Sequence, residues 1–274
     1  MRKNKSVLLS VPYIVWMVVF TLIPLGVVAY YALTDPETGA FTWSNILELG
    51  TYLPVFGQSI LYSLVSALIC LVLGYPVAYY IAHRGHVAQK ILYMLVMLPM
   101  CMSFLLRTLA WVGLLQDTGI INNLLEAIGL SRVKLIRTPA AVILGMVYNY
   151  LPYMILPLYS IIVKIDNRLI EAAEDLGCTP VQTFVKVVLP LSTPGIVSGI
   201  TMVFVPAVST FYISQKLGGA GTVLIGDIIE RMFKQGNNAN LGAALSLLLM
   251  ILVFVCTGIM NKLTGSDGED VVIV

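Results

Sequence analysis

Residues 171–177 read Glu-Ala-Ala-Glu-Asp-Leu-Gly, and nine residues later positions 187–190 read Val-Val-Leu-Pro. Both pieces lie in segment 163–193, a polar break between two long apolar runs. The paired alanines would let another surface come close, and Glu171 offers it a polar or ionic contact. The stretch therefore predicts a contact point for a second protein between two membrane spans.

Capping signals predict that this segment forms two short helices. Asp166 or Asn167 can cap the first helix, and Gly177 can end it in the left-handed conformation that glycine tolerates. Thr179 can open the second helix, with Pro180 at its first position and Gln182 completing a capping box. A capped hairpin joined by short links to its two spans is stiff enough to transmit a push into the membrane.

The composition is that of a membrane protein. Of the 274 residues, 58% are hydrophobic and 11% are charged, whereas soluble domains carry about 25% charged residues. The mean hydropathy is +0.91. A net charge of +2 is too small to suggest nucleic acid as a partner. No pair of the four cysteines has the spacing of a metal site, so neither a metal nor a disulfide framework is predicted.

The apolar runs predict an all-helical integral membrane protein, since about 20 residues cross a bilayer. Six spans are predicted, at 8–33, 58–82, 91–113, 139–162, 194–216 and 241–262. Arg2, Lys3 and Lys5 precede the first span, and the 34–57 loop has acidic but no basic residues. By the positive-inside rule both termini, and the 163–193 hairpin, then face the cytoplasm.

Three parts are expected along the chain. Residues 1–57 form an uncleaved N-terminal anchor helix with the first outer loop. Residues 58–262 form the transmembrane domain, which includes the cytoplasmic loop 163–193. Residues 263–274 form a short cytoplasmic tail.

The hairpin resembles the cytoplasmic coupling loop of ABC importer permeases, which have the type I importer fold. The matching positions are Glu171, Ala172, Ala173, Gly177, Leu189 and Pro190. The family more often has Ile where this chain has Val187. The resemblance implies that the loop docks into a groove of a separate ATP-binding subunit.

Softer motifs narrow the resemblance to the B-type permease subunit of spermidine/putrescine importers. They are Arg107–Trp111, Asp117–Asn122, Pro206–Tyr212, Leu217–Gly219 and Leu224–Asp227. The resemblance implies a bacterial cytoplasmic (inner) membrane location. It also implies a second permease subunit forming a heterodimer, a homodimeric ATPase that carries ATP and Mg²⁺, and an extracytoplasmic substrate-binding protein.

The source of energy follows by exclusion. The chain has no phosphate-binding G-x-x-x-x-G-K-[ST] motif, so it is expected to be a transport subunit without catalytic residues or a cofactor of its own. The predicted spans contain no Asp or Glu, the usual relays of ion-coupled carriers. Other possibilities are a permease for a metal, phosphate or thiamine, an ion-coupled secondary carrier, or a membrane scaffold.

Aromatic and hydroxyl side chains are the candidates for a polyamine path, because an aromatic face attracts a cation by about 0.5–2 kcal/mol. The candidates are Asn149, Tyr150, Tyr153, Ser209, Thr210 and Tyr212. Tyrosines at the membrane interface or in helix contacts are the alternative.

Arg107, Trp111, Asp227 and Glu230 are candidates for an outer gate or for docking a binding protein. Snorkelling of Arg107 beside Trp111 is the alternative for the first pair. A solvated helix face is the alternative for the acidic pair. Gly195 and Gly199 form a GxxxG motif in the fifth span, whose neighbour is either within this chain or in the partner permease.

Overall fold

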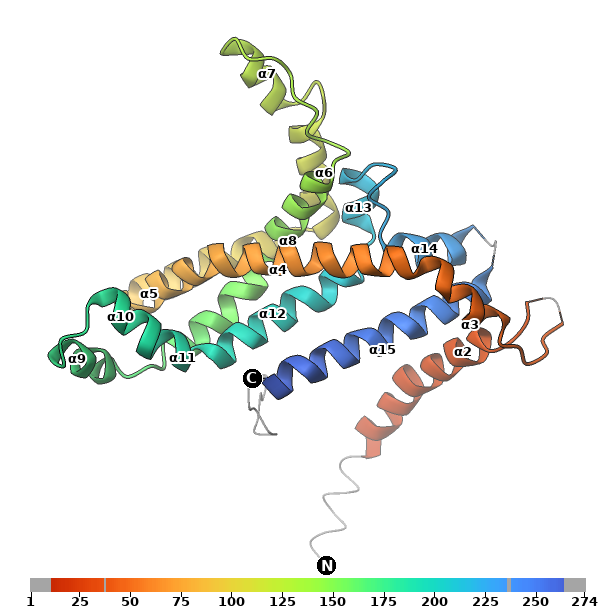
Figure 1. Ribbon diagram of the computed structural model, residues 1–274, viewed down its shortest axis with the longest axis horizontal. Coiled ribbons are helices and arrows are strands. Elements are labelled where there is room, and N and C mark those ends of the chain that lie inside the picture. The colour runs from red at the N-terminus through yellow and green to blue at the C-terminus, as the bar shows by residue number, and fades with distance from the viewer. Residues whose placement is uncertain (1–10, 37, 236–237, 264–274) are drawn as a thin grey trace, which may run out of the picture. The chain divides into compact units, whose positions relative to one another are not determined.

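The chain is mainly helical over the residues that the computed structural model describes, which are 11–36, 38–235 and 238–263. Figure 1 shows these helices, and the β-structure described is an isolated bridge between Thr34 and Phe41. Five helices are long and apolar enough to cross a membrane. A sixth span results when the bent pair Pro180–Leu191 and Thr193–Val208 is counted as one. The predicted all-helical, six-span class is confirmed.

Two compact units divide the chain. Residues 1–54 and 228–252 make one unit, and residues 55–227 and 253–274 make the other. The first part of the last helix, α15 (Ala239–Leu263), thus belongs to the unit of the N-terminal helix. Each unit is therefore built from two segments that are far apart in the sequence. The basic residues before position 11 and the predicted tail from 264 onward lie outside the described residues.

The N-terminal helix of the first unit runs over Val11–Ala32 and contains a π-helical turn, η1 (Val18–Leu22), before α2 (Ile23–Ala32). The Ile23 amide bonds to the carbonyl of Val18, five residues back. The next residue, Pro24, has no amide hydrogen to donate. The wider turn therefore lets the helix pass through a proline that would otherwise clash with the preceding turn.

Asparagine side chains tie the first unit together after this helix. Asn45, in α3 (Ser44–Glu48), donates to the carbonyls of Ala32 and Thr34 at 3.2 and 3.0 Å. Asn240 donates to the carbonyl of Thr34 at 2.5 Å. A short helix η2 (Leu49–Tyr52) follows α3. The small apolar core beneath consists of Ala32, Ala243 and Ala244.

In the second unit, α4 (Leu53–Ala82) packs closely on α8 (Pro139–Ile162). The buried face of α4 is a stripe of small residues, which includes Ser59, Ser63, Ser66, Ala67, Cys70, Gly74 and Ala78. The Ser66 hydroxyl lies 3.3 Å from the Met146 sulfur. A Cβ atom on Gly74 would lie 3.2 Å from Cγ of Met154. Small residues thus allow the two backbones to approach, as is usual in membranes.

The GxxxG motif of the fifth span faces α8 of the same chain. It lies on α12 (Thr193–Val208). A Cβ atom on Gly199 would lie 2.6 Å from the Met154 sulfur, and one on Gly195 would lie 3.1 Å from the Pro157 carbonyl oxygen. The helix that contacts the GxxxG motif is therefore α8 of this chain and not a helix of the partner permease.

The predicted continuous third span, 91–113, is wrong. The structure has α5 (His86–Met97), a 3-10 turn η3 (Leu98–Cys101) and then α6 (Phe104–Leu115). Met102 and Ser103 between them are extended, with ψ of 149° and 131°. Pro99 cannot continue the α-helical hydrogen bonding, while the apolar composition continues through the break. Hydropathy alone therefore cannot detect the interruption.

The fifth span is also shorter than the predicted 194–216. Helix α12 ends at Val208, and α13 (Tyr212–Leu217) starts after a break. Pro206 lies just before the break, and the Ser209 hydroxyl bonds to the Val205 carbonyl at 3.2 Å. This side-chain bond competes with further helical bonding. Helix α13 then packs against α6 and α8.

Candidate functional site

The first helix of the predicted hairpin ends as the sequence indicates. It is α9 (Asn167–Asp175), and Gly177 follows it with φ of +85°. The Cys178 amide donates to the Ala173 carbonyl at 3.0 Å, and the Gly177 amide donates to the Glu174 carbonyl at 2.8 Å. This pair of bonds is the Schellman arrangement, which satisfies the last carbonyls of the helix.

Both helices of the hairpin begin with the predicted caps. The Asp166 side chain accepts the Arg168 amide at 3.0 Å. At the second helix, α10 (Pro180–Thr183), the Thr179 and Gln182 side chains accept each other's amides in a capping box. Local hydrogen bonds therefore set both starts and the turn between them, which makes the hairpin stiff.

The second helix of the hairpin continues beyond α10. It passes through a π turn, η4 (Phe184–Val188), into α11 (Leu189–Leu191). The Leu189 amide bonds to the Phe184 carbonyl, five residues back. As at Pro24, the wide turn directly precedes a proline, and it removes the clash that would end the helix. Pro190 is therefore inside the helix, and the chain bends by 64° between Leu191 and Thr193.

Two large apolar side chains are strongly exposed on the hairpin. Leu176 is 86% exposed and Val181 is 71% exposed, and Glu171 and Ala172 beside them are also exposed. Large apolar side chains with this degree of exposure are typical of an interaction surface. The hairpin does not need them for its own stability, because the hydrogen bonds of its caps hold its conformation.

Ala173 does not belong to that surface. The prediction that both alanines present a close-approach surface is wrong, because Ala173 is buried and only Ala172 faces outward. Successive residues of a helix point about 100° apart, so adjacent positions rarely share one face. The small side chain of Ala173 instead lies on the inner side of α9, which contacts the second helix of the hairpin.

Three of the candidate path residues are buried among α8, α12 and the segment after α12. Asn149 donates to the Gly145 carbonyl at 2.9 Å. The Tyr150 hydroxyl donates to the Pro206 carbonyl at 3.3 Å, and Thr210 is buried nearby. Tyr150 thus joins α8 to α12, at a carbonyl three residues before Ser209. These contacts are those of a helix junction.

The other three path candidates keep accessible surface. Tyr153 is 37% exposed, with its ring 6.3 Å from that of Tyr150. Ser209 is exposed. Tyr212 is half-buried, with Phe104 on one side and the Lys216 ammonium 5.7 Å from its ring. An exposed hydroxyl and two aromatic rings on these elements could line a passage, and this role stays a prediction.

The outer candidates on α6 are held by the chain itself. The Arg107 side chain is 7% exposed, and its Nε and Nη1 atoms have no hydrogen-bond partner among the described residues. It is a buried side chain and does not reach toward bulk water as snorkelling requires. Trp111, one turn away, packs edge-on against Tyr148 of α8, with ring centroids 5.3 Å apart.

The prediction that Asp227 faces outward, as an outer docking residue or on a solvated helix face, is wrong. This residue lies in the first turn of α14 (Ile225–Lys234), is 2% exposed, and accepts the Leu224 amide at 2.9 Å. A carboxylate there satisfies a free amide and interacts favourably with the helix dipole. Glu230, further along, forms an ion pair with Lys234 at 2.5 Å.

Comparison with known proteins identifies the family. The model of the family described as binding-protein-dependent transport system inner membrane component matches residues 71–264. The chain belongs to this permease family. It is 36% identical to the spermidine/putrescine transport system permease protein PotB of Escherichia coli (strain K12), over 87% of this chain and 90% of that one. It is 38% identical to PotB of Haemophilus influenzae, over 88% of each.

Solved structures place the permease in the same fold. A chain of a bacterial ABC transporter that imports alginate matches with a TM-score of 0.82 and 19% identity, over 98% of this chain and 97% of that one. A chain of the MetNI methionine ABC transporter matches with a TM-score of 0.60 and 21% identity, over 78% and 94%. The permease is therefore a multi-pass transport subunit with the fold of ABC importer permeases, and not an enzyme.

Sequence reasoning missed the residues that anchor the hairpin to the permease. Phe184 packs edge-on against Tyr75 and Tyr79 of α4, at 5.4 and 5.9 Å between ring centroids. The Tyr75 hydroxyl lies 2.7 Å from the Ser192 hydroxyl, at the bend before α12. One signal was available, because Phe184 is the only aromatic residue in segment 163–193. These contacts connect the hairpin to both α4 and α12.

Proposed function

We propose that the permease forms, with a second permease, the path of an ATP-driven importer of polyamines in the bacterial inner membrane. The names of its 36–38% identical relatives, which cover most of the chain, support spermidine and putrescine as cargo. An extracytoplasmic binding protein delivers the cargo, and both termini of the permease lie in the cytoplasm. ATP and Mg²⁺ bind to a homodimeric ATPase and not to this chain.

The hairpin carries this proposal. Its outward face, with Glu171, Ala172, Leu176 and Val181, docks onto the ATPase. Closure of the ATPase pushes the hairpin, and the stiff caps prevent it from bending. Phe184 and Ser192 pass the displacement to α4 and α12, and Gly195 and Gly199 couple α12 to α8. The helices that carry Tyr150, Tyr153 and Ser209 then move together.

The test is uptake of labelled solute into cells that make the four components and lack other polyamine importers. We expect spermidine and putrescine to enter only when all four are present, which are this permease, the second permease, the ATPase and the binding protein. Uptake should continue when an uncoupler removes the proton gradient while ATP is maintained. Uptake of thiamine, phosphate or a metal in place of polyamines would contradict the cargo. Loss of polyamine uptake when the proton gradient is removed would contradict ATP as the energy source.

The exposed ring of Tyr153 gives a separate prediction for the path. Tyr153→Ala should reduce polyamine uptake by about 2- to 30-fold, the equivalent of one cation–π contact of 0.5–2 kcal/mol. Tyr153→Phe should retain most of the uptake, because the ring remains. Initial rates of spermidine uptake at several concentrations would measure the effect.

Tyr148→Ala is the matched control, since Tyr148 lies on the same helix with the same 37% exposure but packs on Trp111. Tyr150 stays unchanged in this series, because its hydroxyl joins two helices. If Tyr153→Ala took up spermidine at the wild-type rate, the Tyr153 ring would not be part of the transport path.

A further inference from the structure

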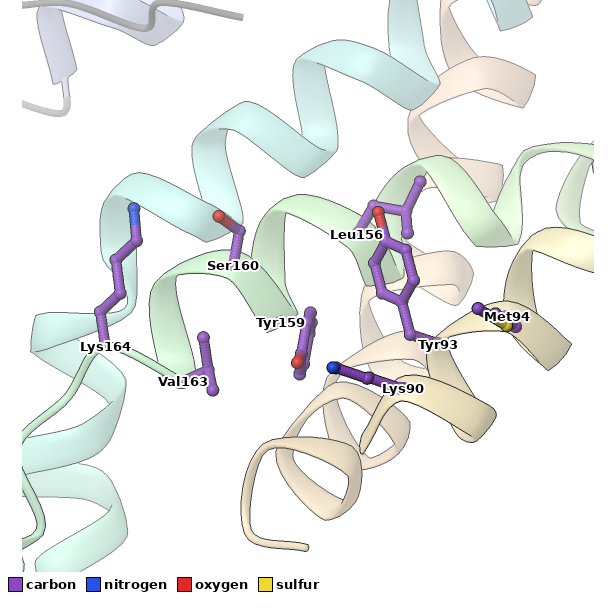
Figure 2. A pocket seen from close by; sticks show the side chains of 8 residues that line it. All are labelled: Lys90, Tyr93, Met94, Leu156, Tyr159, Ser160, Val163 and Lys164. Carbon is purple, nitrogen blue, oxygen red and sulfur yellow. The ribbon is translucent and has the colours of Figure 1, made fainter. Parts of the chain in front are cut away.

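A groove between α5 and α8 is not explained by coupling or by transport. Figure 2 shows it in close-up, with a free volume of about 370 Å³. It is lined mainly by Tyr93, Leu156, Tyr159 and Val163, with Lys90 and Lys164 among the lining residues. Lys164 lies between the end of α8 and the Asp166 cap of α9, so the groove lies at the same end of α8 as the hairpin.

The floor of the groove is aromatic and apolar. The Tyr93 and Tyr159 rings lie 5.5 Å apart and are inclined by 45°. Tyr159 also donates a long hydrogen bond of 3.5 Å to Gln89, which orients its ring. Leu156 and Met94 extend this surface away from the lysines (Figure 2). A ligand that follows this floor needs a hydrocarbon part.

The edge of the groove is positively charged. Neither Lys90 nor Lys164 forms an ion pair within the part of the chain that the structure describes. In Figure 2 the Lys90 ammonium points toward Tyr159, and Lys164 lies beyond Ser160 with its ammonium directed away from Lys90. No Asp or Glu occurs in the sequence between Leu49 and Gln116. The acid next to Lys164 is Asp166, whose carboxylate already caps α9.

Arg84 of an adjoining polar groove adds to the same positive charge. The adjoining groove shares Val163 with the first groove and is lined by His83, Arg84 and His86 among others. A polyamine would be repelled from this end of the permease, because the fixed charges have its own sign. The ligand that fits is an anion with an apolar tail.

We propose that this groove binds an anionic phospholipid of the inner leaflet, with its phosphate attracted by Lys90 and Lys164 and an acyl chain over Tyr93 and Leu156. The proposal rests on the cytoplasmic orientation of the hairpin given under the proposed function. Basic pockets between helices on the cytoplasmic side are the usual sites of anionic headgroups. A lipid bound here would contact Val163 and Lys164, which directly follow the end of α8. It would therefore stabilise the position of the hairpin at the point where the hairpin joins α8.

The experiment uses the whole importer complex in nanodiscs that contain a photoactivatable lipid. Phosphatidylglycerol and phosphatidylcholine probes carry the same diazirine in the acyl chain, and mass spectrometry maps the labelled peptides. We expect phosphatidylglycerol to label peptides 90–94 and 156–164 at least about fivefold more than phosphatidylcholine. Each lysine contributes a factor of about five, so Lys90→Gln with Lys164→Gln should remove the preference.

Lys262→Gln is the control, because Lys262 is an exposed lysine near the end of α15 and outside the groove. It should leave labelling unchanged, as should the double variant Lys90→Arg with Lys164→Arg, which keeps both charges. Soluble glycerol phosphate in excess should not displace the probe, since it has no acyl chain. Displacement by glycerol phosphate would overturn the lipid as occupant in favour of a free phosphate.

Three further results would overturn the proposal. They are equal labelling by the two lipids, unchanged labelling of the glutamine double variant, and absence of label in the groove while other surfaces are labelled. The last would mean that a partner helix covers the groove in the complex. ATP hydrolysis stimulated by the loaded binding protein is measured on the same nanodiscs. It reports on the proposed function separately, since the labelling does not depend on turnover.

Discussion

Leu176→Asp should release the ATPase from the complex and reduce polyamine uptake at least about tenfold. Leu176 is 86% exposed on the hairpin, and burying a leucine in an interface contributes about 1.5–3 kcal/mol. The aspartate loses this burial and adds a charge that must be desolvated. Co-purification of the ATPase with the tagged permease, and uptake in cells, measure the two effects.

Leu124→Asp is the matched control for this prediction. Leu124 is 65% exposed, but it lies on α7 (Ile120–Ala127), away from the hairpin in the sequence. Its replacement should leave the ATPase bound. The folded amount of Leu176→Asp should match the wild type, because the side chain makes few contacts within the chain. If the ATPase stayed bound to the Leu176→Asp variant, the proposal that this face of the hairpin docks onto the ATPase would be wrong.

Gly226→Ala should destabilise the permease strongly, although it adds a single methyl group. The added Cβ atom would lie 2.6 Å from the Thr210 carbonyl oxygen and 2.7 Å from that of Ser209. Both atoms belong to the backbone, so a rotamer change cannot relieve the clash. Overpacking of this kind costs about 1–3 kcal/mol.

The surroundings of Gly226 make movement more difficult. The Ile225 amide donates to the Ser59 hydroxyl of α4 at 2.8 Å, and Asp227 accepts the Leu224 amide. Sliding α14 away from the segment after α12 would break the bond between Ile225 and Ser59. The temperature at which half of the complex loses its monodisperse peak in size-exclusion chromatography would measure the loss.

Gly221→Ala serves as the control in the same loop, since a Cβ atom added there would have no neighbouring atom within 4 Å. The carbonyl of Gly221 accepts the Gln58 side chain at 2.9 Å, and this bond survives the substitution. We expect an unchanged transition temperature for Gly221→Ala. Equal temperatures for the two alanine variants would show that α14 is free to shift from the Ser209 and Thr210 carbonyls.

Local chemistry explains why the hairpin was predictable from sequence. The bonds of its caps join residues at most five positions apart, as at Gly177 and between Thr179 and Gln182. Such bonds depend on residue type and spacing alone, so the pattern at 166–182 predicted the turn and both helix starts. The number of apolar runs likewise predicted six spans, because bilayer thickness sets the length of each.

Contacts between distant segments explain what was missed. The start of α14, which carries Asp227, is held by Ser59 of α4, 166 residues away from Ile225, and the hairpin anchor depended on Tyr75 meeting Ser192, 117 residues away. Breaks after Pro99 and Val208 occur within apolar stretches, where hydropathy is the same for a helix and for an extended link.

The amino-acid sequence by itself determined the membrane class, the stiff hairpin and the family, because these depend on composition and on short-range spacing. Only the tertiary structure decided which side chains remain accessible. It turned Ala173 inward, enclosed Arg107 and Tyr150, and directed Gly195 and Gly199 at α8. Burial is a property of the surfaces that surround a residue, and those surfaces come from helices that lie far away along the chain.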